Sequence, residues 1–101
     1  MINPSIEPEI LEAQWDRQQV AALFHDLQQG DLQHRVVIQH VQVRSSLGDR
    51  SMPLAEAQTL FAQGDAKAIQ IRYQFDGQLW CDTLMVGPET TKVIRTQLPD
   101  A

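Results

Sequence analysis

The sequence predicts an α+β fold, a two-layer sandwich in the order α-β-α-β-β-β with two helices on one face of a four-strand, mostly antiparallel sheet. Three observations predict it. Two segments, 16–30 and 51–64, repeat apolar residues at helical spacing. Residues 69–75 alternate apolar and polar side chains without exception. The dipeptide Asp76-Gly77 follows at once, and it is a strong signal for a two-residue hairpin turn.

The first helix is expected to begin after Asp16, whose carboxylate can accept hydrogen bonds from backbone N–H groups of the first turn. Gln19, three residues later, completes a capping-box pattern, and Trp15 is placed to pack on the first turns. Gly30 is expected to close the helix. One face of this helix is apolar and carries Val20, Leu23, Phe24 and Leu27.

In the next apolar segment, residues 36–43, the apolar residues that alternate along the strand change from even positions to odd positions midway. Val36 and Ile38 share one strand face, whereas Val41 and Val43 share the other. A β-bulge at Gln39-His40 would restore a single buried face, because two residues would then lie opposite one. The alternative is a strand that is covered on both faces.

Residues 45–51 are expected to form a loop that ends at Ser51, the expected cap of the second helix. Pro53 then falls in the first turn, where its missing N–H costs nothing, and Gly64-Asp65 ends the helix. The expected buried stripe of this helix is Leu54, Ala57, Leu60 and Phe61.

The last third of the chain reads as a three-strand meander, with a turn at 87–90 before a final strand at 91–98. A two-residue turn at Asp76-Gly77 would fix the register of the hairpin. Tyr73 would then lie opposite Trp80 and Ile71 opposite Asp82, on the face that we expect beneath the helices.

Composition places the chain among small soluble proteins: it has 101 residues, of which 43% are hydrophobic and 21% charged. We expect residues 1–14 to form an acidic extended arm and residues 15–101 to form a single domain. The arm is expected to be solvated or to dock on a basic partner.

The net charge is −5 and no basic face is evident, so nucleic-acid binding is not expected. The start of the chain lacks the cations and apolar run of a signal peptide, and no stretch is apolar enough to span a membrane. The single cysteine excludes an internal disulfide and a cysteine-based zinc site. Together these features favour the cytoplasm.

Asp82 is the residue that the pattern does not explain, because it lies between Trp80 and Leu84 on the expected inner face. A buried carboxylate needs a partner or a proton. The structural interpretation gives Asp82 a hydrogen bond from a helix-terminal N–H, from Tyr73 or Trp80, or from Arg95. The functional interpretation is a ligand pocket between helices and sheet that combines four residues: His40, Tyr73, Trp80 and Asp82.

Other residues that could carry chemistry do not form a catalytic set, so an enzyme is not the preferred interpretation and no cofactor is expected. His25 points away from the apolar face of its helix. His34 and His40 are six strand residues apart, roughly 20 Å, so they cannot chelate one metal ion. Cys81 lies mid-strand opposite Arg72, where a packed or interface thiol is expected rather than a nucleophile.

The second face of the hairpin carries Leu79, Cys81 and Met85 with Arg72 beside them. If both helices cover the opposite face, these four residues form an apolar patch with polar neighbours, which is typical of an association surface. The alternative is that Ile6, Ile10 and Leu11 of the arm fold over the patch. The sequence therefore favours a small interaction module, an adaptor, accessory or inhibitor-like protein, that binds another protein or a second copy of itself.

Overall fold

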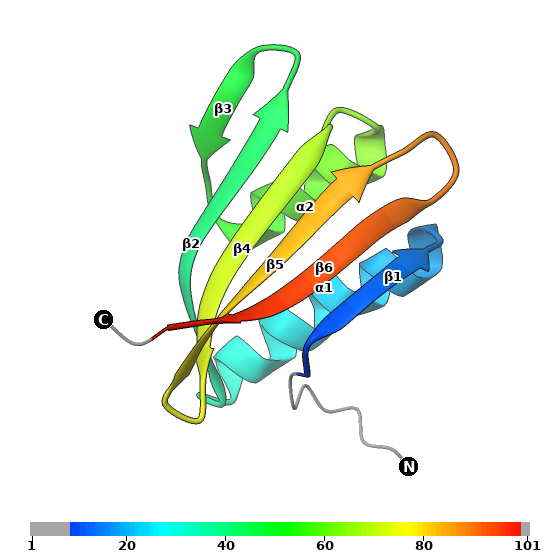
Figure 1. Ribbon diagram of the computed structural model, residues 1–101. Helices are drawn as coiled ribbons and strands as arrows, with labels where there is room; N and C mark the ends of the chain where they lie inside the picture. The colour runs from blue at the N-terminus through cyan, green and yellow to red at the C-terminus, as the bar shows by residue number, and fades with distance from the viewer. Residues whose placement is uncertain (1–8, 100–101) are drawn as a thin grey trace.

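A computed structural model describes residues 9–99, which form two helices and one six-stranded sheet (Figure 1). Every neighbouring pair of strands is antiparallel, and the spatial order is β1-β6-β5-β4-β2-β3. In chain order the elements are β1 (Leu11–Trp15), α1 (Arg17–Leu32), β2 (Val36–Ser45), β3 (Gly48–Ser51), α2 (Leu54–Gln63), β4 (Ala68–Phe75), β5 (Gln78–Val86) and β6 (Thr91–Leu98).

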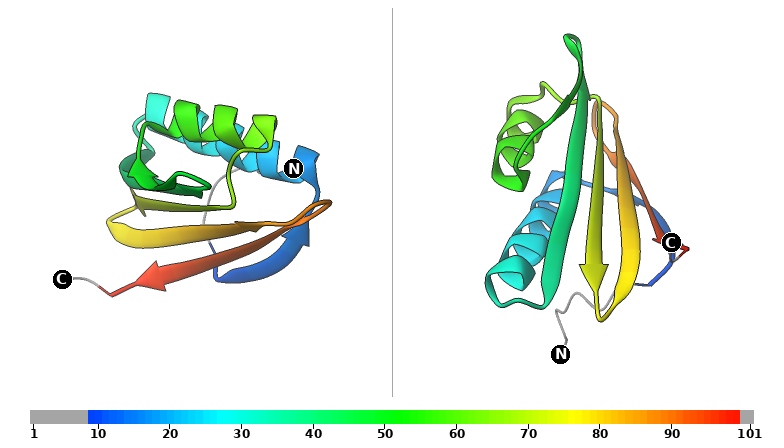
Figure 2. Two further views of the ribbon diagram at one scale, coloured as in Figure 1. Left: turned by 90° about the horizontal axis from the view of Figure 1, so that it is seen from above. Right: turned by 90° about the vertical axis from the view of Figure 1, so that its left-hand side faces the viewer.

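Both helices lie on the same face of the sheet, and the two views in Figure 2 show the opposite face without a covering layer. The predicted α+β class and the helices on one face are confirmed, but the sheet has six strands instead of four. The apolar stripes of both helices pack on the inner face of the sheet. The core includes Val20, Leu23, Phe24, Leu27, Leu54, Ala57, Phe61, Ile69, Ile71, Tyr73, Trp80, Leu84 and Val93.

The first additional strand is β1, which pairs with β6 at one edge of the sheet. The sequence placed residues 11–14 in an extended arm, and the structure makes them part of the sheet together with Trp15. Leu11 lies opposite Arg95 and is half-buried, whereas Ile10 just before it is 75% exposed. Ile6 and the rest of residues 1–8 lie outside the described residues.

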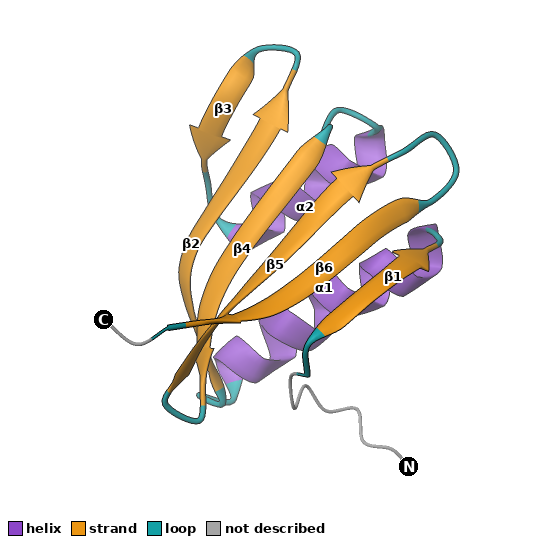
Figure 3. Cartoon of the chain, in the orientation of Figure 1, coloured by secondary structure: helices purple, strands orange, loops and turns teal. Residues whose placement is uncertain are grey.

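The second additional strand, β3, turns back along β2 to make the opposite edge (Figure 3). The sequence predicted a loop here because all four residues of β3 are polar or glycine, and all four are exposed. Ser51 ends this strand, so it is not the cap of α2; Pro53 occupies the N-cap position and makes no side-chain hydrogen bond there.

The predicted start of α1 is confirmed at Asp16, where the capping box with Gln19 is complete. The predicted end at Gly30 is wrong, because the helix continues to Leu32. His34 adopts the left-handed conformation, with φ of 60°, and its N–H donates to the Asp31 carbonyl while the Arg35 N–H donates to the Gly30 carbonyl. These two bonds are those of a Schellman motif, so a histidine takes the position at which glycine was expected.

The β-bulge in β2 is confirmed, since the pairing of β2 with β4 shifts register between Ile38 and His40. Val36 lies opposite Phe75 and Val41 lies opposite Ile71, so both halves of the strand turn apolar side chains toward the helices. One inserted residue thus explains the change in parity, and the alternative of a strand covered on both faces is not needed.

The hairpin register is also confirmed. Asp76 and Gly77 have φ of 52° and 76°, as a type I′ turn requires, and Tyr73 lies opposite Trp80. Asp82 therefore lies on the inner face, opposite Ile71 on one side and Arg95 on the other.

Candidate functional site

Asp82 is fully buried and is held by two side chains from neighbouring strands. The Arg95 guanidinium donates from Nε to Oδ1 and from Nη2 to Oδ2, both at 2.8 Å. The Tyr73 hydroxyl donates to Oδ1 at 2.9 Å. Because three donors satisfy its two oxygens, Asp82 has the partners that the structural interpretation required, namely Arg95 and Tyr73.

The charges of this triad shift the pKa values of both partners. Burial lowers the pKa of Arg95, but the hydrogen bonds and charge of Asp82 raise it by more, so the net pKa of Arg95 lies above its ordinary value. Burial raises the pKa of Tyr73 far above its usual range, and the neighbouring Asp82 charge adds to the rise. The folded triad therefore holds a neutral tyrosine and a charged guanidinium.

The raised pKa of Tyr73 predicts a loss of stability at alkaline pH. An unfolded tyrosine releases its proton near pH ~10, whereas the folded protein keeps it, so the stabilisation is complete below about pH 10 and falls as pH rises above it. We expect the free energy of unfolding to decrease by up to about 1.4 kcal/mol per pH unit there, beyond any decrease seen in Tyr73→Phe.

Denaturant titrations of both proteins from pH 8 to 11 would measure this difference. Tyr73 is the only tyrosine of the chain, so ultraviolet absorbance reports its ionisation directly. Parallel stability profiles for the two proteins, or a tyrosinate signal in folded protein near pH ~10, would contradict the prediction.

The structure does not bring together the four residues of the predicted ligand pocket. Tyr73, Trp80 and Asp82 share the inner face, but His40 is paired with Arg72 on the opposite face and contacts the Ser51 hydroxyl through Nε2 at 2.8 Å. Trp80 is buried, and its indole N–H has no hydrogen-bond partner among residues 9–99. These four side chains therefore do not line one cavity.

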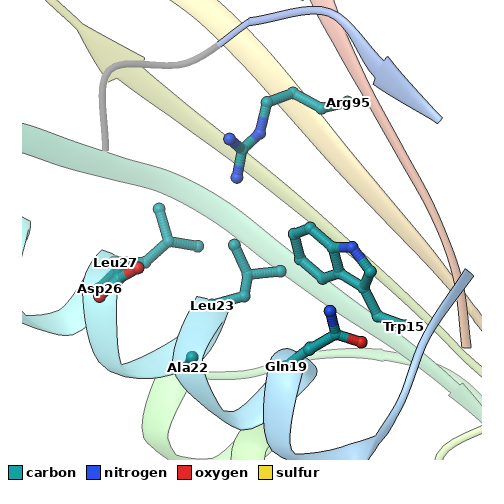
Figure 4. A pocket seen from close by; sticks show the side chains of 7 residues that line it. All are labelled: Trp15, Gln19, Ala22, Leu23, Asp26, Leu27 and Arg95. Atoms are coloured by element: carbon teal, nitrogen blue, oxygen red, sulfur yellow. The ribbon is translucent and has the colours of Figure 1, made fainter. Parts of the chain in front are cut away.

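A different pocket lies beside the triad, between α1 and the sheet near the β1 edge (Figure 4). Its volume is about 270 Å³, and it is lined by Trp15, by Arg95 and by five side chains of α1. The Arg95 side chain extends from β6 toward the helix, while Trp15 lies beside it at the end of β1 (Figure 4). Sequence reasoning named Asp82 as the centre of a pocket, and the structure instead places its partner Arg95 at the pocket wall.

The four residues of the predicted association surface lie on the face without helices, as expected. Arg72 is exposed, Leu79 is half-buried and Met85 is 53% exposed. Cys81 is only 5% exposed, and its sulfur lies 3.9 Å from the Thr83 hydroxyl. Arg72, Leu79 and Met85 are thus available to a partner, whereas Cys81 is a packed thiol that offers little surface.

Met85 lies between two depressions of this face. One, of about 250 Å³, is bordered by residues of β2 to β4, including Gln42 and Gln70. The other, of about 530 Å³, is bordered by the β5–β6 turn and the start of β6, including Pro88 and Lys92. The exposed thioether is therefore flanked by concave surface on both sides.

Neither helix of the described residues has the length and apolarity needed to cross a membrane. Within residues 9–99 no three side chains of the histidine, cysteine, aspartate or glutamate type gather at one possible metal site. Comparison of the chain with protein-family models, with curated proteins and with solved structures finds no match. The functional interpretation therefore depends on the geometry of the two surfaces described above.

Proposed function

We propose that this protein is a small interaction module that binds through the helix-free face of its sheet, called here the outer face. The outer face consists of side chains from β2, β4, β5 and β6, namely Val37, Arg72, Gln74, Leu79, Cys81, Thr83, Met85, Ile94 and Leu98. The observation that carries the proposal is the exposure of apolar side chains there: Met85 is 53% exposed and Val37 is 52% exposed. Covering such side chains would contribute about 25 cal/mol per Å² of apolar area.

The occupant that we propose is a second copy of this chain, packed face to face. With strands about 4.8 Å apart and about 3.3 Å per residue, the helix-free side of all six strands, including the edge strands β1 and β3, covers roughly 700 Å². A stable interface buries about 800 Å² per partner, so a dimer would use nearly this whole side of the sheet, including the two edge strands.

A two-fold axis parallel to the strands would place β4 and β5 of one copy over β5 and β4 of the other, because the strand order is reversed across such an axis. The exposed Arg72 of β4, which makes no ion pair within residues 9–99, would then lie over β5 of the partner copy.

Sedimentation velocity over a range of protein concentrations tests the proposal. We expect a concentration-dependent dimer, and we expect Met85→Arg to weaken it by at least about tenfold, because the substitution places a charge on an apolar side chain that the interface would cover. The matched control is Leu32→Arg, which changes a 72% exposed apolar residue at the end of α1, away from the outer face.

A dimer that Met85→Arg and Leu32→Arg weaken equally would place the interface elsewhere. A monomer at all concentrations would exclude the second copy as occupant. In that event, immobilised protein with and without Met85→Arg would show whether a different protein is retained through the outer face.

We propose the cytoplasm as the site of action. The single cysteine is buried, and a fold that uses no disulfide suits a reducing compartment.

A further inference from the structure

The pocket beside α1 contains a guanidinium with unused hydrogen-bonding capacity. Arg95 has five N–H donors, and Asp82 accepts from Nε and from Nη2 along one edge of the group. The remaining donors lie along the other edge, on Nη1 and Nη2, and no other hydrogen bond of Arg95 is formed within residues 9–99. The Arg95 side chain is only 14% exposed, yet it lines the pocket. A carboxylate that enters the pocket could therefore accept two parallel bonds from this free edge.

The charges around the pocket select against a simple anion. Arg95 is already neutralised by the fully buried Asp82. Asp26 of α1 also lines the pocket, is half-buried and forms no ion pair within the described residues. These three groups sum to −1, so a lone carboxylate would meet repulsion from Asp26, whereas a ligand with an additional ammonium group would be attracted to it.

The other walls of the pocket are mostly apolar. Leu23 and Leu27 of α1 and the indole of Trp15 surround the space in front of Arg95 (Figure 4). The volume of about 270 Å³ lies just below the usual range for drug-sized ligands, so the pocket suits a small molecule.

We propose that this pocket binds a small zwitterion with an apolar side chain, of the α-amino-acid class. Its carboxylate accepts from the free edge of Arg95, its ammonium group faces Asp26, and its side chain contacts Leu23, Leu27 and Trp15. This site lies on the inner side of the sheet, so the proposal is independent of the outer-face interaction and is tested separately.

Three matched probes test the proposal: L-leucine, 4-methylpentanoate, which lacks the amine, and 3-methylbutylamine, which lacks the carboxylate. Binding is measured by calorimetry and by the shift of the Trp15 indole N–H resonance. We expect saturable binding of L-leucine that shifts this resonance, and at least about tenfold weaker binding of each analogue, because each loses one charged hydrogen-bonding partner. Failure of L-leucine to bind, or equal binding of either analogue, would overturn the assignment.

Two variants locate the site without disturbing the buried triad. Ala22 is an exposed residue of α1 that lines the pocket, so Ala22→Leu fills the space and should lower the affinity for L-leucine by more than about tenfold. Asp26→Asn removes the partner of the ammonium group and should lower it about tenfold.

The matched control is Ala21→Leu, which makes the same change at the adjacent exposed alanine, outside this pocket. We expect its affinity to stay within about twofold of the original, a difference of less than 1 kcal/mol. If Ala22→Leu binds L-leucine as well as Ala21→Leu does, the zwitterion is not in this pocket.

Discussion

Asp82→Asn is expected to lower the free energy of unfolding by about 3–5 kcal/mol. The substitution preserves shape but removes the negative charge, so the largely buried Arg95 guanidinium, 14% exposed, loses its counter-ion, and the fully buried asparagine supplies no charge in its place. The amide of the new asparagine would also direct its own N–H groups toward a donor of Arg95 or Tyr73. Since small domains are stable by only about 5–15 kcal/mol, this one change would remove a large part of the total, and urea denaturation would measure it as a lower midpoint at unchanged slope.

The chain contains a matched control for this prediction. Asp49 forms a similar two-bond pair with Arg44, at 3.0 and 3.4 Å, but on the surface, where the two side chains are 41% and 67% exposed. Asp49→Asn should cost much less than Asp82→Asn, because solvent screens the exposed pair. Equal effects of the two substitutions would show that burial of the Asp82 pair contributes nothing.

A combined variant distinguishes the net contribution of the triad to the free energy of unfolding from the cost of leaving one member without its partner. Replacing all three members, as Asp82→Leu, Arg95→Met and Tyr73→Phe, removes both charges and the hydroxyl together. We expect this protein to be more stable than Asp82→Asn alone, because no buried polar group is left without a partner. If it is less stable than Asp82→Asn, the triad contributes net attraction in addition to satisfying its own polar groups.

The inner face of the hairpin was predictable from sequence because short-range geometry determines it. The strict alternation of apolar and polar residues in β4 predicted which side chains lie on each face, and Asp76-Gly77 predicted the two-residue turn. Together they determine the register, which places Asp82 opposite Ile71. Arg95 could be named as one candidate partner because the next strand returns antiparallel beside β5. Choosing Arg95 among the candidate partners of Asp82 required the register of β6. The turn at 87–90, which precedes β6, is longer than two residues and does not specify that register.

The two edge strands were not predicted, for a physical reason that they share. An edge strand pairs on one side only, so its sequence can stay polar without exposing a hydrophobic surface. All four residues of β3 are exposed, and no apolar periodicity marks them. In β1 the inward positions are Leu11, Ala13 and Trp15, a pattern too short to distinguish from an extended lead-in.

The pocket beside α1 was out of reach of sequence reasoning because its walls come from three separate segments. Asp26 lies about 60° from Leu23 around the helix, at the border of the apolar stripe. Whether such a border residue meets solvent or a cavity depends on how far the helix stands from the sheet edge. The pocket also includes Trp15 at the end of β1, the strand that the sequence did not predict.

Deletion of Gln39 is the second large effect that we expect, with a loss of about 1.5–3 kcal/mol in the free energy of unfolding. The deletion removes the extra residue of the bulge, so the start of β2 shifts by one position relative to β4. Val36 and Ile38 would turn to the outer face and Val37 would turn inward. Each buried aliphatic side chain contributes about 1.5–3 kcal/mol, and the single inward valine would recover only part of the loss of two.

Gln39→Ala is the matched control, because it keeps the inserted residue and changes only an exposed side chain. We expect it to alter stability by less than about 0.5 kcal/mol in the same denaturant titration. If the deletion is tolerated as well as the substitution, the start of β2 can turn either set of alternating side chains toward the helices. The inserted residue would then contribute nothing to the stability of the sheet.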